Sequence, residues 1–273
     1  MKTSNFLTFD IEEWYHANYD GVDISKHSNT DTNLEHSVDR LIELCGSYGV
    51  KSTCFILGSV AKAKPYIVKK LHDAGHEIAS HGMNHKLIYN MTPDEFSLDL
   101  YESTDVLEQI TGEKVVGFRA PSWSMSKEIS GWFYETLEMQ GYRYSSSIYP
   151  ASNPLFGIPN ANRMPHMVGG ILEIPQSIMS IAGYECGYAG GGFFRFFPRW
   201  LIEREIKKAN KEGRPVFLYL HPREIEPDQP KLDIRGSDKF FHYYGINGCE
   251  AKLTEIVGDF KDSFVRMDKY RLD

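Results

Sequence analysis

The sequence predicts an α/β protein built around a parallel sheet. Short β-type runs alternate with helical patterns along all 273 residues, and no boundary interrupts this alternation. Such a pattern is typical of either a barrel or a doubly wound sheet. Polar residues suited to chemistry follow four predicted strands, at Asp10, His81, Arg119 and His221. Because barrels carry their active residues at the carboxyl ends of their strands, this recurrence favours the barrel.

The individual elements follow from hydrophobic periodicity and from helix start and stop signals. The predicted strands are residues 5–9, 52–57, 77–80, 115–118, 143–147, 172–174, 216–220 and 264–267. The predicted helices are residues 37–48, 64–74, 93–110, 126–139, 198–212 and 253–260. The third helix has the clearest start, with Thr92 as its cap, Pro93 in the first turn and Glu95 three residues after the cap. Residues 149–170 form a long irregular segment that is either a lid or a surface insertion.

The composition is that of an ordinary globular protein, with 41% hydrophobic and 25% charged residues. A net charge of -7 argues against nucleic acid as the main partner, because binding phosphates requires a basic surface. No apolar stretch is long enough to cross a bilayer, and the N-terminus lacks the pattern of a signal peptide. We therefore expect a cytoplasmic protein without a transmembrane segment. The four scattered cysteines predict reduced thiols, and the oligomeric state is left open.

The first predicted strand runs into an acidic segment that predicts two convergent carboxylates. If the strand continues past Phe9, alternation puts Asp10 and Glu12 on one face and Ile11 and Glu13 on the other. The alternative is a solvated acidic loop, which explains Glu13 well but explains an aspartate at the strand end poorly.

The segment SHGMNH places His81 and His85 four residues apart, after another strand. By itself such a pair is weak evidence for a metal site. With one of the two opening carboxylates it could complete a His-His-carboxylate site, which leaves positions open for water and substrate, and the other carboxylate would be free to act as a base. Zinc is the default ion for these ligands, and iron, cobalt, nickel or manganese are also accepted by such sites.

Two further motifs follow strand ends. In FRAPSW, Arg119 could keep a neighbouring carboxylate ionised and oriented, and Trp123 offers a flat face for stacking; a structural ion pair is the alternative role for the arginine. In LYLHP, His221 suits a general acid or base, although a lone histidine at a strand end is more often structural.

The glycine-rich run at residues 188–198 lacks the pattern of a nucleotide phosphate loop. Its glycines, Gly191 among them, would instead let the backbone approach a substrate or a neighbouring strand. Among the remaining histidines, His16 alone is near enough to the opening motif to be kept as a further candidate.

Taken in order, five of these motifs resemble those of the polysaccharide deacetylase family, also called the NodB-homology or carbohydrate esterase 4 group. They are TFDIE (8–12), SHGMNH (80–85), FRAPSW (118–123), YRYSSSI (142–148) and LYLHP (218–222), and they span most of the chain. The details are most similar to the branch found in exopolysaccharide and O-antigen gene clusters. That branch tends to show DxEEW, GGGxFR, HPxEI and a C-terminal HYxGxxxxxxKL, all of which occur here.

The resemblance implies a distorted (β/α) barrel with seven or eight strands. It also implies one catalytic domain over residues 1–273, with a C-terminal extension from about residue 236 packed on it. The roles that it implies are a catalytic base, Asp10, held by Arg119; a general acid, His221; and two metal ligands, His81 and His85. The expected substrate-binding positions are Trp14, Ser122, Trp123 and Gly191, with a backbone amide near Ser122 as the oxyanion donor.

Two positions depart from the family pattern. Many members have a second aspartate directly after the base as the third metal ligand, and here that position is Ile11, so Glu12 is the natural substitute. The fourth motif often carries an aspartate that orients the acid histidine, and here we find Ser145.

The resulting hypothesis is a metal-dependent hydrolase that removes an N-acetyl group from an amino-sugar residue of a polysaccharide or its precursor. The substrate could be nucleotide-linked, lipid-linked or polymeric. One alternative is a hydrolase of another C–N bond, in a cyclic or linear amide, on the same barrel. The other is a non-catalytic carbohydrate-binding protein on a decayed deacetylase scaffold, for which Ile11 and Ser145 would be the evidence.

Overall fold

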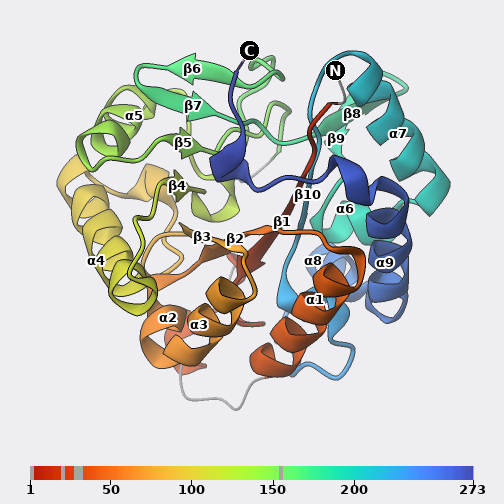
Figure 1. Ribbon diagram of the computed structural model, residues 1–273, viewed down its shortest axis with the longest axis horizontal. Coiled ribbons are helices and arrows are strands. Elements are labelled where there is room, and N and C mark those ends of the chain that lie inside the picture. The colour runs from red at the N-terminus through yellow and green to blue at the C-terminus, as the bar shows by residue number, and fades with distance from the viewer. Residues whose placement is uncertain (1–2, 20–21, 28–32, 154–155, 273) are drawn as a thin grey trace.

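The computed structural model describes residues 3–19, 22–27, 33–153 and 156–272. Within these residues, an eight-stranded sheet forms the centre of the protein, and helices surround it (Figure 1). The strands of this sheet are β1 (Phe6–Ile11), β2 (Thr53–Ile56), β3 (Glu77–Ser80), β4 (Gly117–Phe118), β5 (Tyr144–Ser145), β6 (His166–Val168), β7 (Ile171–Glu173) and β10 (Phe217–Leu220). A separate hairpin consists of β8 (Ile178–Ile181) and β9 (Tyr184–Gly187).

The helices alternate with the strands along most of the chain, as the sequence predicts. They are α1 (Leu34–Tyr48), α2 (Gly58–Ala63), α3 (Pro65–Asp73), α4 (Pro93–Thr111), α5 (Ser130–Met139), α6 (Gly191–Phe196), α7 (Arg199–Lys211), α8 (Gly236–Tyr243) and α9 (Cys249–Phe260). No helix in the described part of the chain is both long and apolar enough to cross a membrane.

The sheet has the order β10-β1-β2-β3-β4-β5-β7-β6, and all neighbouring pairs are parallel except β6 and β7. The two ends of this order, β10 and β6, are not paired with each other within the described residues, so the sheet is curled but open. Parallel strands joined by helical crossovers confirm the predicted α/β class, and the open curl corresponds to the distorted barrel.

The register of the sheet determines which residues meet at its carboxyl edge. Phe9 of β1 pairs with Leu220 of β10, and Ser80 of β3 pairs with Phe118 of β4. In parallel strands the residues that follow each such pair are neighbours, so Asp10 lies beside His221 and His81 lies beside Arg119. The chain is held in this register by burial, since β1 is buried along its whole length and its Leu7, Phe9 and Ile11 belong to the main hydrophobic cluster, together with apolar residues of the helices.

The predicted start of α4 is confirmed in detail. The Thr92 hydroxyl accepts a hydrogen bond from the Glu95 backbone N–H at 3.2 Å, and the Glu95 carboxylate accepts one from the Thr92 backbone N–H at 2.8 Å. This reciprocal pair satisfies donors that a helix N-terminus leaves unpaired. The helix ends at Gly112, which adopts a left-handed φ of 71°.

The predicted last strand, residues 264–267, is wrong. Phe264 makes one isolated bridge to Asn5, and residues 267–269 form a 3-10 turn instead. Helices α6 and α8 and the β8–β9 hairpin were not among the predicted elements. In the irregular segment 149–170, residues 154–155 lie outside the described residues, whereas Phe156 packs against Trp123 with ring centroids 6.2 Å apart and residues 166–168 form β6.

Candidate active site

Four side chains meet where β1, β3, β4 and β10 end. Asp10, near the end of β1, lies next to His221, which follows β10. His81, which follows β3, lies next to Arg119, which follows β4. In the first pair, Asp10 Oδ2 lies 4.0 Å from His221 Nε2, close enough for an ionic interaction but too far for a hydrogen bond. Asp10, His81 and Arg119 are buried, and the His221 side chain is 13% exposed. The four strand-end residues singled out by the sequence therefore lie in one place.

A second group at the same edge could hold a metal ion. Glu12 Oε2 lies 2.9 Å from His85 Nε2 and 4.0 Å from His81 Nε2, and one ligand atom from each residue lies within 4.8 Å of the other two. The His81 Nδ1 lies 2.8 Å from the Arg119 carbonyl oxygen. Because a carbonyl only accepts, Nδ1 carries the proton, and the Nε2 lone pair is left to face Glu12.

The loop that carries the two histidines depends on a glycine. Gly82 has a φ of 77°, and a Cβ at this position would lie 2.8 Å from Asp99 Oδ2. Asp99 in turn accepts a hydrogen bond from the Met83 backbone N–H at 2.8 Å, which fixes the turn between the histidines. His85 itself has a φ of 55°, a conformation that costs energy for a residue with a side chain.

The donor set fits a metal ion. Glu12 Oε2 is buried and has no hydrogen-bond partner among the described residues, although two imidazoles face it. Burial by itself would raise the pKa of Glu12, but His85 and His221 hold it well below its ordinary value. Burial lowers the pKa of His81 to about 4, so its imidazole is neutral and able to ligate. An ionised carboxylate with a neutral imidazole beside it is what a divalent cation requires.

Arg119 holds the carboxylate of Asp10. Its Nη1 donates to Asp10 Oδ1 at 2.6 Å and to the Thr8 hydroxyl at 3.0 Å, and its Nη2 donates to the Ser146 hydroxyl at 3.3 Å. The guanidinium is fully buried and lies 4.0 Å from the centre of the Phe55 ring. Asp10 is thereby fixed through one oxygen, and its other oxygen faces His221.

His221 lies between the site carboxylates and a further acid. Its Nε2 is 3.5 Å from Glu12 Oε1, and its Nδ1 is 3.2 Å from Glu224 Oε2. Burial by itself would lower the pKa of His221, but Glu12 and Glu224 raise it above its ordinary value. Glu224 is absent from the residues singled out by the sequence. The signal that could have found it is the spacing His-x-x-Glu at the start of a 3-10 turn, where the Glu224 carboxylate accepts the His221 backbone N–H at 3.0 Å.

The two departures from the family pattern have clear positions. Ile11 is fully buried in the core, on the opposite strand face from Asp10. Ser145 donates its hydroxyl to Ser147 Oγ at 2.9 Å, so it is engaged within its own segment rather than with His221.

Glu13 and His16 lie beside the cluster of Glu12, His81 and His85. Glu13 pairs with Lys64, with 2.7 Å between Oε1 and Nζ. His16 accepts a hydrogen bond from the Glu13 backbone N–H at 3.0 Å, and its ring centre lies 5.9 Å from that of His85. Burial, and then the charge of His85, lower the pKa of His16 to about 3.

The structure gives less support to a substrate-binding role for the residues predicted to have one. Trp14 is only 5% exposed and Trp123 only 6%, so neither offers much surface on which a sugar could stack. Gly191 has a φ of 57°, and a Cβ there would lie 2.7 Å from the Tyr219 hydroxyl, which gives this glycine a packing role. Ser122 has a left-handed φ of 51°, and its hydroxyl accepts from the Asn18 amide at 3.0 Å.

Backbone strain gathers at this edge. Among the described residues, five non-glycine residues have a positive φ, and His85, Ser122 and Trp123 are three of them. Residues held in such conformations cost free energy and cluster at functional sites in folded proteins. The Asn18 amide links two of these residues, because it also lies 3.2 Å from His85 Nδ1.

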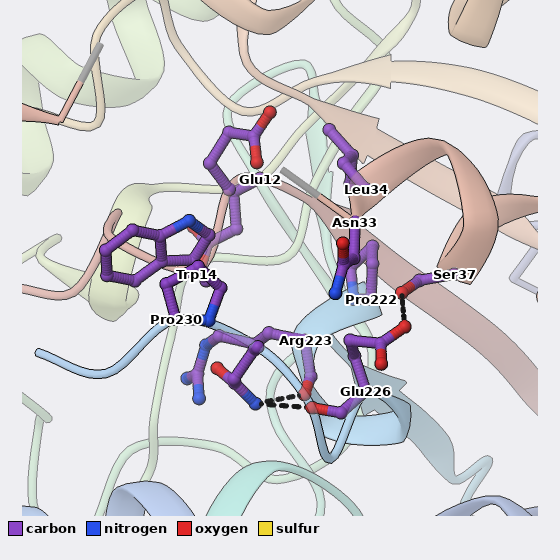
Figure 2. A pocket seen from close by; sticks show the side chains of 11 residues that line it. Glu12, Trp14, Asn33, Leu34, Ser37, Pro222, Arg223, Glu226 and Pro230 are labelled. Atoms are coloured by element: carbon purple, nitrogen blue, oxygen red, sulfur yellow. Dashed lines mark hydrogen bonds between the residues drawn. The ribbon is translucent and has the colours of Figure 1, made fainter. Parts of the chain in front are cut away.

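A small pocket lies behind Glu12 (Figure 2). Its lining includes Trp14, Arg223 and Glu226, and in this view the Glu12 carboxylate points away from the last two. Of the three candidate metal ligands, only Glu12 lines this pocket, and Asp10 and His221 are not among its lining residues.

The sequence profile of the polysaccharide deacetylase family matches residues 5–144, just over half of the chain. The chain belongs to this family. A second profile, described as a domain of unknown function (DUF3473), matches residues 146–271. The peptidoglycan deacetylase of Helicobacter pylori is 30% identical over 114 residues, which are 42% of this chain and 38% of the relative. The chain thus spans well under half the length of this curated relative.

Solved structures share the fold at low sequence identity. A provisionally assigned polysaccharide deacetylase from Mycobacterium smegmatis has a TM-score of 0.63 and 18% identity, over 96% of this chain and 86% of that one. Puue allantoinase has a TM-score of 0.61 and 14% identity, over 97% and 87%. A CE4 family pseudoenzyme from Bacillus anthracis has a TM-score of 0.54 and 12% identity, over 98% and 66%. The predicted NodB-like barrel is therefore confirmed.

Proposed function

We propose that this chain is a metal-dependent carbohydrate N-deacetylase. The observation that carries the proposal is the convergence of two groups at one sheet edge. The Glu12, His81 and His85 cluster borders a carboxylate held by arginine, Asp10, and an imidazole with a raised pKa, His221. Family membership and the deacetylase relative support the reaction class.

Glu12, His81 and His85 would hold one divalent ion, with zinc first for this ligand set and iron, cobalt, nickel or manganese as alternatives. When bound, the ion supplies Lewis-acid polarisation of the acetyl carbonyl and lowers the pKa of water. In the reaction, a water oxygen bonds to the acetyl carbon and the C–N bond breaks. Asp10 accepts the water proton, and His221 Nε2 donates a proton to the departing amine, which gives acetate and a free amino sugar.

The remaining residues orient these groups. Arg119 fixes Asp10 through the 2.6 Å hydrogen bond to Oδ1, so Oδ2 is the oxygen available to the water. The left-handed turn at Ser122 would present a backbone N–H to the oxyanion, a donor worth about 3 kcal/mol in comparable sites. The substrate class that the resemblance suggests is an exopolysaccharide or O-antigen precursor, whether nucleotide-linked, lipid-linked or polymeric.

Hydrolysis of another C–N bond is the second candidate. The observation that favours it is the burial of Trp14 and Trp123, because exposed aromatic faces were the sequence argument for a sugar ring. Among the fold neighbours, one is an allantoinase. A decayed, non-catalytic scaffold is less well supported, because Asp10 keeps its ion pair with Arg119 and its place beside His221.

The test is release of acetate from N-acetylated amino sugars by the purified protein, with a cyclic amide as the competing substrate. We expect acetate release that a chelator abolishes and that added zinc restores. Asp10→Asn should lose at least about 10²-fold in kcat while binding zinc normally, because Asp10 is not among the ligands. Asp105→Asn, an exposed change on α4, is the matched control. Persistent activity of Asp10→Asn would remove Asp10 as the base, and hydrolysis of the cyclic amide alone would favour the second candidate.

A further inference from the structure

A buried ion pair lies directly behind His221. Arg195 Nε donates to Glu224 Oε1 at 3.0 Å, and the two side chains are 1% and 0% exposed. The other oxygen, Glu224 Oε2, accepts the His221 backbone N–H at 3.0 Å and lies 3.2 Å from its Nδ1. One carboxylate oxygen thus contacts the main chain and the ring of the same histidine, which fixes the ring relative to the strand end.

This contact decides which ring nitrogen carries a proton. Burial would raise the pKa of Glu224, but Arg195 and then His221 hold it well below its ordinary value, so the carboxylate is ionised. An ionised carboxylate only accepts hydrogen bonds, so His221 must donate from Nδ1. Its Nε2 is then the nitrogen that faces Asp10 and Glu12, at 4.0 and 3.5 Å.

Arg195 is itself anchored by the C-terminal part of the chain. Its Nη1 donates to the carbonyl oxygens of His242 and Tyr244 at 3.0 and 2.7 Å, and its Nη2 donates to that of Phe241 at 2.8 Å. These carbonyls lie at the end of α8, where a helix leaves acceptors unpaired and where a cation is favoured. Gly245 follows, and a Cβ there would lie 3.1 Å from the Arg195 carbonyl oxygen.

We infer that Glu224, held by Arg195, is the positioning residue of the proton donor, in place of the aspartate that Ser145 replaces. The inference rests on the proposed function, and it names the group that orients His221. Glu224 keeps its charge and transfers no proton; it fixes the Nδ1–H tautomer and presents Nε2 to the departing amine. Ser145 does not serve this purpose, because its hydroxyl is bonded to Ser147.

The position of Glu224 and Arg195 gives a role to residues 146–271, the region that matches a domain of unknown function. Residues 5–144 supply the base, its arginine and the candidate metal ligands, whereas residues 146–271 contain His221, the Arg195–Glu224 pair and the end of α8 that anchors it. The second region is therefore the proton-donor half of a shared active site.

The tautomer is measured by ¹⁵N NMR of histidine-labelled, zinc-loaded full-length protein, at a pH where the ring is neutral. His221→Gln assigns the signal. We expect the Nδ1–H tautomer in the wild type. Glu224→Gln removes the negative charge that favours Nδ1–H, and either orientation of its amide sets the NH₂ against a donor, Arg195 Nε or the His221 backbone N–H. We therefore expect the fraction of the Nε2–H tautomer to rise in this variant. An Nε2–H tautomer in the wild type, or no change in Glu224→Gln, would overturn the inference.

Kinetics test the consequence for catalysis. Departure of an alkylamine requires a proton, whereas the phenolate of 4-nitrophenyl acetate leaves without one. We expect Glu224→Gln to lower kcat roughly 10²-fold on an N-acetylated amino sugar with an unchanged KM, and only a few-fold on the aryl ester. An equal loss on both substrates contradicts a role in proton donation.

Glu173→Gln is the control for removing a buried carboxylate. Glu173 is also 0% exposed, and it accepts the backbone N–H groups of Ser147 and Ile148 at 2.8 and 2.9 Å, away from His221. Glu173→Gln should keep the His221 tautomer of the wild type. It should also keep the wild-type ratio of kcat on the N-acetylated amino sugar to kcat on the aryl ester. If Glu224→Gln does not fold, the tautomer of His221 in the wild type tests the inference by itself: Nδ1–H supports it and Nε2–H overturns it. If the wild type releases no acetate, the proposed function fails while the tautomer still tests the positioning.

Discussion

Glu12 and Glu13 are adjacent in the sequence, yet their carboxylates have different neighbours. Glu12 faces His81 and His85, whereas Glu13 pairs with Lys64 on the other side of the chain. Residues that alternate along an extended segment point to opposite faces, so one step along the chain separates a candidate ligand from a structural ion pair. Both glutamates are buried, and burial alone does not distinguish them.

This pair gives a test at the scale of one residue. Glu12→Gln should weaken zinc binding by more than about 10²-fold, because it removes a charged ligand rather than an outer partner. Glu13→Gln should bind zinc like the wild type and should lose stability only, because Lys64 loses an ion pair. Calorimetric zinc titration of both variants measures this. Normal zinc affinity in Glu12→Gln would exclude it as the third ligand.

At this scale the sequence indicated the strand-end residues well, because the carboxyl edge of a parallel sheet collects them whatever their distance along the chain. It could not show that Trp14 and Trp123 are buried, since hydrophobic patterning says nothing of which loops cover an aromatic ring. It also missed Glu224, whose contact with His221 depends on a tight 3-10 turn and on an arginine from α6.

Among the elements, α4 was predicted most fully because its boundaries are set locally, by a capping box and a glycine. Helix α6 was missed because its glycines are poor helix formers. Their presence has a tertiary cause: a Cβ at Gly190 would lie 2.0 Å from the Tyr219 ring, and Gly191 is similarly close to its hydroxyl. The last predicted strand failed because Phe264 makes only an isolated bridge, to Asn5, among the described residues.

The cap of α4 provides a prediction about one element. Thr92→Ala removes the acceptor for the Glu95 backbone N–H and should lower the free energy of unfolding by about 1 kcal/mol, measured by urea denaturation. The matched control is Thr254→Ala in the middle of α9, where the hydroxyl bonds the Glu250 carbonyl oxygen at 2.8 Å. That change should be neutral or stabilising, because alanine is the better residue in a helix interior. Equal losses in both variants would contradict a capping role.

Over the whole molecule, one sheet runs through both matched regions. Strands β1 to β4 lie within residues 5–144, β7 and β10 lie within residues 146–271, and β5 falls where the two matches meet. A single catalytic domain over residues 1–273 stays a prediction, and the continuity of this sheet supports it. The C-terminal segment is joined to the rest of the fold near the site, where Arg195 of α6 donates to the Phe241 carbonyl oxygen. It also contacts the sheet directly, through the backbone N–H groups of Met267, bonded to Thr53 of β2, and of Asp268, bonded to Glu77 of β3.

Glu77 lies among groups from distant parts of the chain. Its carboxylate accepts hydrogen bonds from Thr53 Oγ1 at 2.6 Å, from the Tyr144 hydroxyl at 2.8 Å and from the Asp268 backbone N–H at 3.0 Å. Burial, and then the negative charge of Asp268, raise its pKa from 4.5 to about 7. The folded state therefore binds more protons than the unfolded state between these two values.

The stability of the whole protein should consequently fall as the pH rises through this window. A raised carboxyl pKa contributes stability that is present below pH 4.5 and is lost as the pH passes about 7. At 1.36 kcal/mol per pH unit the loss has an upper limit of about 3 kcal/mol. Glu77→Gln imitates the protonated acid: its amide oxygen can accept from Thr53 and Asp268, and its NH₂ can donate to the Tyr144 hydroxyl oxygen. The stability of this variant relative to the wild type should therefore rise by up to that amount from pH 4.5 to pH 8. Urea denaturation across this range measures the difference, and a difference that does not change with pH would show that Glu77 is not the group responsible.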